Sequence, residues 1–501
     1  MADADHDGSA ALYPDLVAGM EVLVAGLGRS GRAAAAALTA VDAVVTTYDD
    51  DPGTPADWHQ PGEVRFADLV VASPGMRPDH PLLLAADAAG VVVTSEVELA
   101  WWLRCDRDGA GPAPWLAVTG TNGKTTTVGM LGAILTAHGE QAAVVGNVGT
   151  PVVEVVRDPR VEVLAVELSS FQLSRTVAMR VQAGAVLNVA ADHLDWHGSM
   201  AAYAAAKARV WHGAEVARVY NADDPATVDL VDGSRHGLGS GAGRPETDPG
   251  APDLALAVGF TLGPPAAGQL GVVDGALVDR AFGAGGPADP VELALVADLA
   301  RLAGPNGVPA PHVVADALAA AALARAHGVA AEHVRAGLAA FAPGAHRIVT
   351  VAQVGDVSFV DDSKATNAHA AAASLAGFAP GSVVWIAGGL AKGATFGDLV
   401  AAQADRLRAA VLVGTDRAPW RDALARHAPQ VPVIEVDGGE TETVMTRAVA
   451  AAHRLATDPA LGSGPVVVLL APASASMDQF ASYAERGDRF AQAARALARG
   501  T

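Results

Sequence analysis

The sequence predicts an α/β protein built from three domains in series. Short valine-rich runs alternate with alanine-rich stretches of helical length, the pattern of parallel strands joined by crossover helices. Two glycine- and proline-bearing segments, Asp106–Pro114 and Pro343–Ile348, interrupt this alternation. A chain of 501 residues that is 51% hydrophobic can bury about three cores of ordinary size. We therefore expect domains over residues 1–112, 113–343 and 344–501.

The first domain is expected to be Rossmann-like. A glycine loop, Gly26-Leu-Gly-Arg-Ser-Gly31, follows its first strand and opens an alanine-rich helix, as in nucleotide-binding folds. Asp49 ends the next strand, where a carboxylate can accept a hydrogen bond from a ribose hydroxyl. The expected strands are Glu21–Ala25, Ala43–Tyr48, Asp68–Ala72 and Gly90–Val93.

The second domain is expected to be a mainly parallel sheet of the P-loop ATPase type. Two stretches without periodicity, Gly233–Pro252 and Phe282–Asp289, are expected to be surface loops, and a long helix is expected over Val313–His327. The expected strands are Trp115–Thr119, Ala142–Val145, Val163–Val166, Ala185–Val189 and Ala217–Tyr220.

The third domain repeats the alternation and is expected to be Rossmann-like as well. His346 and Arg347 open it, and a short strand leads into Asp361-Asp-Ser-Lys-Ala-Thr-Asn367. Its later expected strands are Val383–Ala387, Ala410–Val413 and Val466–Leu470.

A phosphate-binding loop is the strongest functional signal. The strand Trp115–Thr119 runs into Gly120-Thr-Asn-Gly-Lys-Thr-Thr126 and then into a helix, so that backbone N–H groups and a helix N-terminus face an anion. Lys124 would reach the β- and γ-phosphates of ATP, and the Thr125 hydroxyl would reach Mg²⁺. Val118 stands where the eight-residue form of the motif has glycine, so this is a shortened variant.

Composition excludes several classes of function. The formal net charge of −21 disfavours binding to nucleic acid or to anionic lipid. Cys105 is the single cysteine, the N-terminus is acidic, and no apolar run of about 18 residues occurs. We therefore expect a cytoplasmic protein without a membrane insertion. We also expect it to act on small molecules and to be a monomer.

The loop Gly120–Thr125 resembles the nucleotide loop of the Mur ligases and folylpolyglutamate synthetases, which join an amino acid to a carboxylate. Glu167-Leu-Ser-Ser-Phe-Gln172, Asn188–Asp195 and Tyr203–Lys207 resemble further family motifs in the expected order. The resemblance implies ATP and two Mg²⁺ ions as cofactors. The implied catalytic residues are Lys124, Glu167, His193 and Lys207. The implied metal ligands are Thr125, Glu167, His193 and Lys207, the last in carbamylated form.

Three C-terminal segments resemble the D-glutamate-adding branch of this family. They are Asp361–Asn367, Gly388–Lys392 and Ala473–Phe480. The resemblance implies ligation of D-glutamate to UDP-N-acetylmuramoyl-L-alanine through an acyl phosphate, in peptidoglycan precursor synthesis. The implied ATP-binding residues are Gly120, Thr121, Asn122, Gly123, Lys124, Thr125, Thr126, Asp316, Arg347, Asp362 and Lys364. The implied UDP-substrate residues are Gly28, Ser30, Asp49, Ser73, Gly75 and Asn147. The implied D-glutamate residues are Thr366, Lys392, Ser476, Met477 and Tyr483.

The chain departs from the family pattern at three places. Asp50 and Asp51 follow Asp49 where the family carries a basic residue, Pro311–Asp316 replaces an asparagine-bearing adenine motif, and Tyr483 stands where phenylalanine is common. Three alternatives remain open at this point. They are a sister ligase that adds another amino acid, a nicotinamide-dependent dehydrogenase or sensor built on the first glycine loop, and a binding module regulated by ATP.

Overall fold

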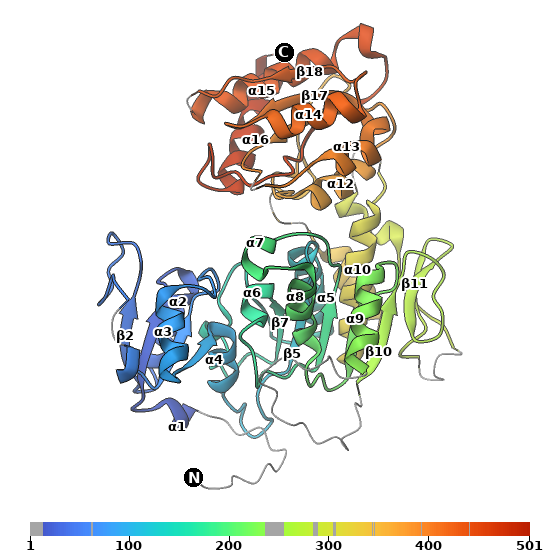
Figure 1. Cartoon of the computed structure of the whole chain (residues 1–501). Coiled ribbons are helices and arrows are strands. Elements are labelled where there is room, and N and C mark those ends of the chain that lie inside the picture. The colour runs from blue at the N-terminus through green and yellow to red at the C-terminus, as the bar shows by residue number, and fades with distance from the viewer. Residues whose placement is uncertain are drawn as a thin grey trace. The chain divides into compact units, whose positions relative to one another are not determined.

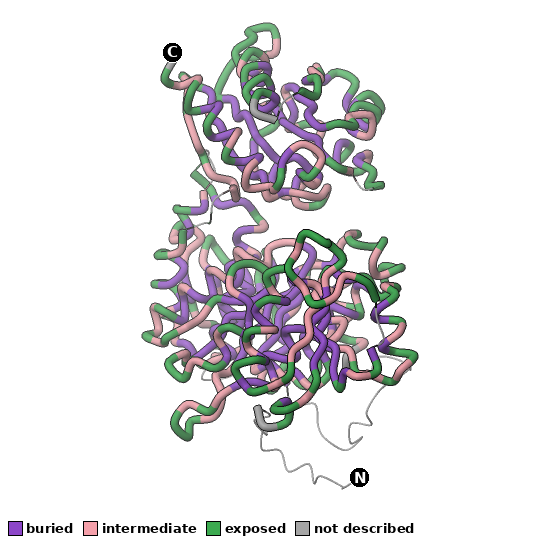
Figure 2. Tube along the Cα trace, turned by 90° about the vertical axis from the view of Figure 1, so that its left-hand side faces the viewer, coloured by how far each residue is buried: buried purple, intermediate pink, exposed green. Residues whose placement is uncertain are grey.

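The computed structural model describes residues 14–61, 64–235, 255–283, 289–303, 307–342, 344, 346–391, 393–439 and 441–500. The chain divides into two compact units (Figure 1). One unit comprises Met1–Ala294 with Asp316–Leu338, and the other comprises Leu295–Ala315 with Ala339–Thr501. Each unit has its own apolar cores, and the residues coloured as buried gather in its interior (Figure 2).

A four-stranded parallel sheet of order β2-β1-β3-β4 begins the first unit. Side chains alternate along β1, so that Val22 and Val24 join one apolar core while Leu23 and Ala25 join another. Helices α2 and α4 bury their apolar side chains in the first core and α3 in the second. Its elements are α1 (Pro14–Val17), β1 (Glu21–Ala25), α2 (Arg29–Thr39), β2 (Val44–Tyr48), η1 (Val64–Phe66), β3 (Leu69–Ala72), α3 (Pro81–Ala89), β4 (Val92–Ser95) and α4 (Glu96–Trp102).

A nine-stranded sheet follows in the same unit, in the order β13-β12-β11-β10-β9-β8-β5-β7-β6. Strand β5 is parallel to both of its neighbours, β7 and β8, so the loops after these three strands leave the same edge. The strands are β5 (Trp115–Thr119), β6 (Ala142–Gly146), β7 (Val163–Glu167), β8 (Ala183–Val186), β9 (Ala217–Asn221), β10 (Leu256–Phe260), β11 (Gln269–Val273), β12 (Ala276–Asp279) and β13 (Val291–Leu295).

Helices connect the strands of this sheet (Figure 1). They are α5 (Lys124–His138), η2 (Val152–Glu154), α6 (Ser170–Leu173), α7 (Leu194–His197), α8 (Met200–Ala208), η3 (Arg209–Trp211), α9 (Pro225–Arg235), η4 (Val296–Leu302), α10 (Pro311–Ala326) and α11 (Ala331–Ala340), of which η4 lies in the second unit and α10 and α11 run across the division.

The second unit is built on a six-stranded sheet of order β14-β15-β19-β16-β17-β18, parallel except for β14. Alternate residues of β16 enter the cores on its two faces, as Trp385 and Ile386 show. The elements are β14 (Val349–Val354), β15 (Val357–Asp361), α12 (Ala368–Ala376), β16 (Val383–Gly388), α13 (Gly397–Gln403), η5 (Ala404–Arg406), β17 (Leu407–Val413), α14 (Ala418–His427), β18 (Val433–Glu435), α15 (Thr441–Ala456), η6 (Pro459–Leu461), β19 (Val466–Leu470) and α16 (Tyr483–Gly500).

The predicted fold class, α/β with largely parallel sheets, is confirmed. The predicted domain limits stay a prediction. Strand β8 begins two residues and ends three residues before the predicted Ala185–Val189. Gly233, predicted to open a loop, lies within α9. The remainder of the predicted loop up to Pro252 lies outside the described residues.

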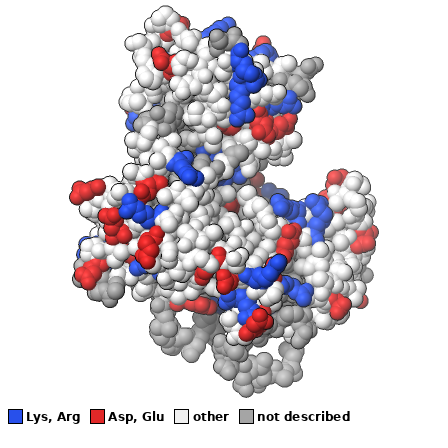
Figure 3. All heavy atoms as spheres, turned by 180° about the vertical axis from the view of Figure 1, so that it is seen from behind, with Lys and Arg blue, Asp and Glu red and all other residues white. Residues whose placement is uncertain are grey.

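Acidic and basic side chains are interspersed on the face seen in Figure 3, with no continuous basic surface. This agrees with the negative net charge. Among the described residues, no helix has both the length and the apolar character needed to cross a membrane.

Candidate active site

The loop after β5 has the backbone form of an anion-binding turn. Gly120 and Gly123 have φ angles of 158° and 85°, and the second value lies in the left-handed region that glycine tolerates best. Helix α5 starts directly afterwards at Lys124, with Thr125 and Thr126 in its first turn. The first turn of a helix generally presents N–H groups that have no acceptor within the helix, and such a turn can receive phosphate oxygens.

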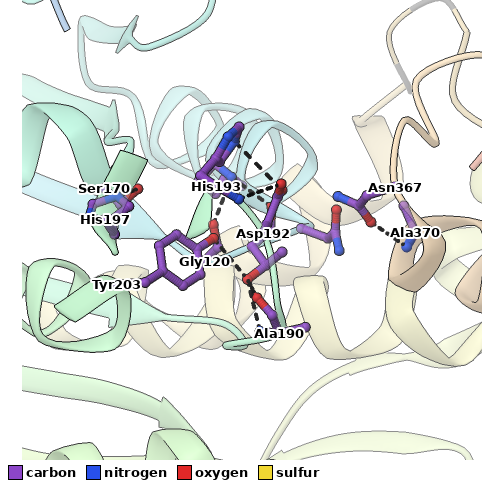
Figure 4. Close-up of polar contacts among 12 residues, drawn as sticks. Gly120, Ser170, Ala190, Asp192, His193, His197, Tyr203, Asn367 and Ala370 are labelled. Carbon is purple, nitrogen blue, oxygen red and sulfur yellow. Dashed lines mark hydrogen bonds and ion pairs between the residues drawn. The ribbon is translucent and has the colours of Figure 1, made fainter. Parts of the chain in front are cut away.

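The exit of strand β8 holds this loop from one side. The Asn122 N–H donates to the Asn188 side-chain oxygen at 2.9 Å, and Asn188 Nδ2 donates back to the Asn122 carbonyl at 3.2 Å. Thr121 Oγ1 lies 3.1 Å from Tyr203 Oη and accepts from the Ala190 N–H at 3.0 Å (Figure 4). The loop is therefore fixed before any nucleotide arrives, which lowers the entropic cost of binding.

Two lysines converge on one carbonyl oxygen of the loop. Lys124 Nζ donates to the Gly120 oxygen at 2.7 Å, and Lys207 Nζ donates to the same oxygen at 2.8 Å. Lys207 is fully buried, and its ammonium also lies 4.4 Å from the centre of the Tyr203 ring. Burial, followed by the charge of Lys124, holds the pKa of Lys207 well below its usual value. The neutral amine is thereby favoured at this position.

Glu167 ends strand β7 and lies next to the start of α5. Thr125 Oγ1 donates to one of its oxygens at 2.6 Å, and Asn147 Nδ2 donates to the other at 3.0 Å. A Cβ added to Gly146 would lie 2.1 Å from the Glu167 carbonyl oxygen, so this glycine lets the Asn147 turn approach so closely.

A magnesium ion fits the pair formed by Thr125 and Glu167. A hydroxyl and a buried carboxylate are hard oxygen ligands, the kind that Mg²⁺ prefers. The described residues contain no group of three histidine, cysteine or acidic side chains placed to hold a metal. At sites of this kind Mg²⁺ usually keeps several waters and also binds nucleotide phosphates.

His193 stands at the entrance to α7 with a φ of 53°, an uncommon conformation outside glycine. Its Nε2 lies 3.6 Å from the Asp192 carboxylate (Figure 4), and its ring packs on Phe171 at 4.8 Å between centroids. Burial is the largest cause of a lowered pKa for His193. His197 stacks on the same Phe171 ring at 5.6 Å. The predicted catalytic histidine is thus held in an aromatic cluster beside the loop.

Asp316 is buried on α10 and lies against the phosphate loop. A Cβ added to Gly123 would be 2.3 Å from its Oδ1. The sequence-predicted nucleotide residues of the first unit therefore come together at one sheet edge, although the adenine-contacting role of Asp316 stays a prediction.

The first glycine loop lies at the carboxyl edge of the four-stranded sheet. A Cβ on Gly31 would lie 1.9 Å from the Gly26 carbonyl oxygen, and one on Gly26 would lie 2.6 Å from Ser73 Cβ. Asp49 Oδ2 accepts the Leu27 N–H at 2.6 Å. Gly28 caps α2, Ser30 lies in its first turn, and Gly75 is exposed after β3. The predicted UDP-substrate residues are therefore together, except Asn147, which lies beside Glu167.

The second unit brings its predicted ligand residues to the carboxyl edge of its own sheet. His346 Nδ1 lies 2.7 Å from Asp361. The neighbouring Asp362 is buried, and this burial raises its pKa to about 6. A hydrogen bond from Ser374 Oγ and the charge of Arg347 both act to lower that pKa.

A buried arginine, Arg486, holds together two segments that lie next to predicted D-glutamate residues. Arg486 donates to the Ser363 side chain and carbonyl and to the Ser474 carbonyl, each at 3.0 Å. Lys364 Nζ lies 4.1 Å from the centre of the Tyr483 ring. The other predicted D-glutamate residues are the half-buried Thr366, the buried Ser476 and the exposed Met477, whereas Lys392 lies outside the described residues.

Sequence reasoning did not single out several residues that shape the site. Asn188, Asp192 and Tyr203 stood in quoted motifs without being assigned a role, and their positions just after a strand or beside a motif lysine were the available signal. Arg486 and Ser374 left no such signal, because their partners are distant in the sequence.

Comparison with known proteins places this geometry in context. Residues 118–236 match the family model of the Mur ligase middle domain. The chain is 52% identical to the UDP-N-acetylmuramoylalanine--D-glutamate ligase of Streptomyces avermitilis, covering 96% of this chain and 98% of the relative. It is 51% identical to that of Streptomyces coelicolor, with 97% and 99% covered, and 46% identical to that of Mycolicibacterium smegmatis, with 96% and 97% covered.

Solved structures share the fold at lower identity. UDP-N-acetylmuramate-alanine ligase from Thermotoga maritima superposes with a TM-score of 0.53 at 17% identity, covering 95% of this chain and 100% of that one. A pseudomurein peptide ligase type C from Methanothermus fervidus also gives 0.53, at 16% identity and with the same coverage.

Proposed function

The chain belongs to the Mur ligase family, and from that membership we propose that it catalyses ATP-dependent addition of D-glutamate to UDP-N-acetylmuramoyl-L-alanine in peptidoglycan precursor synthesis. The observation that carries the proposal is the 45–52% identity, over 95–98% of this chain, to relatives named for that reaction. The solved structures support the fold alone, so the choice of D-glutamate over another amino acid rests on the sequence relatives.

The reaction that we propose has two steps. The terminal carboxylate of the L-alanyl substrate attacks the γ-phosphorus of ATP, which gives an acyl phosphate and releases ADP. The amine of D-glutamate then attacks the acyl carbon, and inorganic phosphate leaves with one of the original carboxylate oxygens. Catalysis of both steps requires positioning and the stabilisation of negative charge.

Lys124 and the loop N–H groups are the groups of this chain best placed to stabilise the phosphates. In the structure the Lys124 ammonium lies against the Gly120 and Thr121 carbonyls, at 2.7 and 3.0 Å. A rotation of this side chain would turn the ammonium from the loop carbonyls toward a bound γ-phosphate. A cation fixed at that place favours the transition state over the ground state, because charge spreads over the transferring group.

We propose that Lys207 is carbamylated. The reaction needs a neutral amine and carbon dioxide, and burial beside Lys124 favours the neutral amine of Lys207. The product is an anion, which would satisfy the positive charge of Lys124 and supply an oxygen ligand. The Tyr203 ring, which lies 4.4 Å from Lys207 Nζ, would then neighbour a carbamate.

Two Mg²⁺ ions are the proposed metal complement. Thr125 and Glu167 would hold one, and His193 with the carbamate of Lys207 would hold the other. When bound, the ions offset the charge of the phosphates. His193 offers an imidazole nitrogen, which binds a metal in its neutral form.

Glu167 and Asn147 form the proposed link between metal and substrate. Asn147 donates to the Glu167 oxygen that Thr125 does not occupy. We place the muramoyl end of the substrate at Asn147, while Gly28, Ser30, Asp49, Ser73 and Gly75 hold the UDP portion. We further propose that Arg347, Asp362 and Lys364 bind ATP, and that D-glutamate is bound by Thr366, Lys392, Ser476, Met477 and Tyr483.

We also propose that the enzyme works in the cytoplasm, where ATP is available, and that it is a monomer. Analytical sedimentation of the purified protein tests the oligomeric state, because a monomer has the chain mass of 50.4 kDa.

The test of the proposed reaction is phosphate release measured with a panel of amino acids. UDP-N-acetylmuramoyl-L-alanine and ATP are supplied with D-glutamate, L-glutamate, meso-diaminopimelate or L-alanine. We expect release with D-glutamate alone, and none from the Lys124→Ala variant, which controls for contaminating ATPases. Release that depends on L-glutamate or diaminopimelate, and not on D-glutamate, refutes the proposal.

A titration with UDP and with NADH separates the ligase from the dehydrogenase alternative. We expect heat of binding with UDP and none with NADH. The reverse result would assign the first glycine loop to a redox cofactor.

A further inference from the structure

Arg175 connects the two sheets of the first unit. It follows helix α6, which connects two strands of the nine-stranded sheet. Its guanidinium reaches the loop after β3 of the four-stranded sheet. Its Nη2 donates to the Met76 carbonyl at 3.1 Å and its Nη1 to the Ser73 carbonyl at 3.5 Å. These two carbonyls bracket Gly75, and the Ser73–Met76 segment is the one assigned above to the UDP portion of the substrate.

We propose that Arg175 is a positioning residue for the UDP-substrate site, which fixes the Ser73–Met76 loop from the ATP-binding side of the unit. The inference rests on the proposed function, because that function assigns Ser73 and Gly75 to the substrate. Arg175 donates to backbone carbonyls of the loop, so it acts through the loop, and the substrate contacts remain with Ser73 and Gly75.

The chemistry of the contact explains why an arginine stands at this position. A guanidinium presents several N–H donors in a rigid plane and can therefore hold two carbonyls at once, which a lysine ammonium on a flexible stem does less well. The side chain is half-buried, and hydrogen bonds that involve a charged donor in such surroundings are stronger than neutral ones. The Ser73–Met76 loop thereby gains a fixed anchor.

A second set of hydrogen bonds, from the segment after Arg175 to a carboxylate on α4, fixes the backbone near Arg175. Glu98, buried on α4 of the first sheet's layer, accepts the backbone N–H groups of Val177, Ala178 and Met179 at 3.0, 2.6 and 3.2 Å. The segment directly after Arg175 is thus hydrogen-bonded to helix α4, in the same part of the fold as the Ser73–Met76 loop that Arg175 contacts. These reciprocal contacts keep the segment from shifting, so the position of the guanidinium is determined by the fold.

The loop that Arg175 holds also packs on the glycine loop. Ser73 donates its N–H to the Ala25 carbonyl at 2.7 Å, and Gly26 approaches it so closely that a Cβ would meet Ser73 Cβ at 2.6 Å. Movement of the Ser73–Met76 loop would therefore disturb both walls of the proposed UDP site. This predicts an effect on binding of the UDP substrate and none on the phosphate loop.

The experiment compares Arg175→Gln and Arg175→Lys with the wild-type enzyme. We expect the Kd for UDP-N-acetylmuramoyl-L-alanine, measured by calorimetry without ATP or D-glutamate, to rise about 10- to 100-fold in Arg175→Gln. We expect a smaller rise in Arg175→Lys, which keeps the charge but has one donor centre. The KM for this substrate should rise in parallel, while the KM for ATP and kcat at saturation stay near the wild-type values.

Arg180→Gln is the matched control. Arg180 is a half-buried arginine of the same segment, but its guanidinium donates to the Val177 and Met179 carbonyls of its own segment. Melting temperatures are recorded for all variants, and the lysine variant decides if the glutamine variant does not fold. An unchanged Kd in folded Arg175 variants overturns the proposal, as does an equal rise of Kd in Arg180→Gln.

The binding measurement also separates this inference from the proposed function. Calorimetry needs no D-glutamate and no turnover. A wild-type enzyme that binds UDP-N-acetylmuramoyl-L-alanine but uses another amino acid contradicts the proposed reaction and leaves the role of Arg175 testable. A wild-type enzyme that does not bind this substrate overturns both.

Discussion

At the residue scale, the central feature is the carbonyl oxygen of Gly120, which accepts hydrogen bonds from two lysines. Two ammonium groups at one oxygen would repel each other, and burial of Lys207 adds a desolvation cost, so the neutral amine of Lys207 is favoured. Carbamylation of this amine would place an anion beside the Lys124 ammonium. The sequence could indicate both lysines through their motifs, but their meeting at one oxygen depends on the fold.

Carbamylation of Lys207 can be observed directly. We expect the enzyme in ¹³C-bicarbonate to show one carbamate carbon signal by NMR, and the Lys207→Ala variant to lack it. Activity should fall at least about 100-fold in that variant, since a buried group beside the phosphates is lost. A wild-type spectrum without the signal, from enzyme that is fully active, would contradict the assignment.

Tyr483 is expected to act through its ring. The contact with Lys364 is an ammonium over an aromatic face at 4.1 Å, which needs no hydroxyl. Tyr483→Phe should therefore keep kcat/KM for D-glutamate and for ATP within about twofold, whereas Tyr483→Leu should lose about 1 kcal/mol of this interaction, a factor of about five. Steady-state kinetics of both variants measure the difference. A large loss in Tyr483→Phe would show that the hydroxyl has its own role.

At the scale of elements, the strands on either side of the phosphate loop were the most predictable. Strand β5 has the predicted bounds, because an apolar run that ends in a glycine turn is an unambiguous signal. Strand β8 lies earlier than predicted, since Gly184 weakens the strand signal while the apolar Leu187 and Val189 extend it beyond the true end. The short strands β10 to β14 were not predicted, because little alternation distinguishes them from the glycine- and proline-rich turns between them.

The start of α2 depends on Gly31. An alanine there would place its Cβ 1.9 Å from the Gly26 carbonyl oxygen, so the helix and the glycine turn would have to separate. We expect Gly31→Ala to lower the free energy of unfolding by about 1 to 3 kcal/mol and to weaken UDP binding. Urea unfolding measures the first effect. Gly75→Ala is the control for stability, because nothing lies within 4 Å of the position that an alanine Cβ would take there. An equal loss of stability in both variants would contradict this explanation.

Helix α4 introduces a pH dependence through Glu96. This buried carboxyl accepts the Val153 N–H at 2.8 Å, and burial raises its pKa to about 7 from 4.5. Between these two values the folded protein holds a proton that the unfolded chain releases, so stability falls as pH rises from 4.5 to about 7 and then levels off.

Glu96→Gln removes this titration and keeps an oxygen for Val153. The free energy of unfolding of the variant, relative to wild type, should therefore increase by roughly 2 kcal/mol between pH 5.5 and pH 8. Urea titrations at the two pH values give this difference. A difference that is the same at both values would show that Glu96 does not titrate in this range.

At the scale of the whole molecule, the sequence predicted the α/β class and the family motifs correctly, while contacts between distant segments were beyond its reach. Glu167, Thr125 and the loop glycines follow strand ends, and the carboxyl edge of a parallel sheet is where such residues gather. Arg175 and Glu98 belong to no sequence motif. Their hydrogen-bond partners are brought near them only where the four-stranded and nine-stranded sheet regions pack together.

The central claim is that one chain activates the L-alanyl carboxylate with ATP and then transfers it to D-glutamate. Its most direct test uses UDP-N-acetylmuramoyl-L-alanine with ¹⁸O in the terminal carboxylate, together with ATP and D-glutamate, and analyses all products by mass spectrometry. We expect the D-glutamyl product, ADP and phosphate that carries one ¹⁸O atom from the carboxylate. Phosphate without the label, or the absence of a D-glutamyl product, would contradict it.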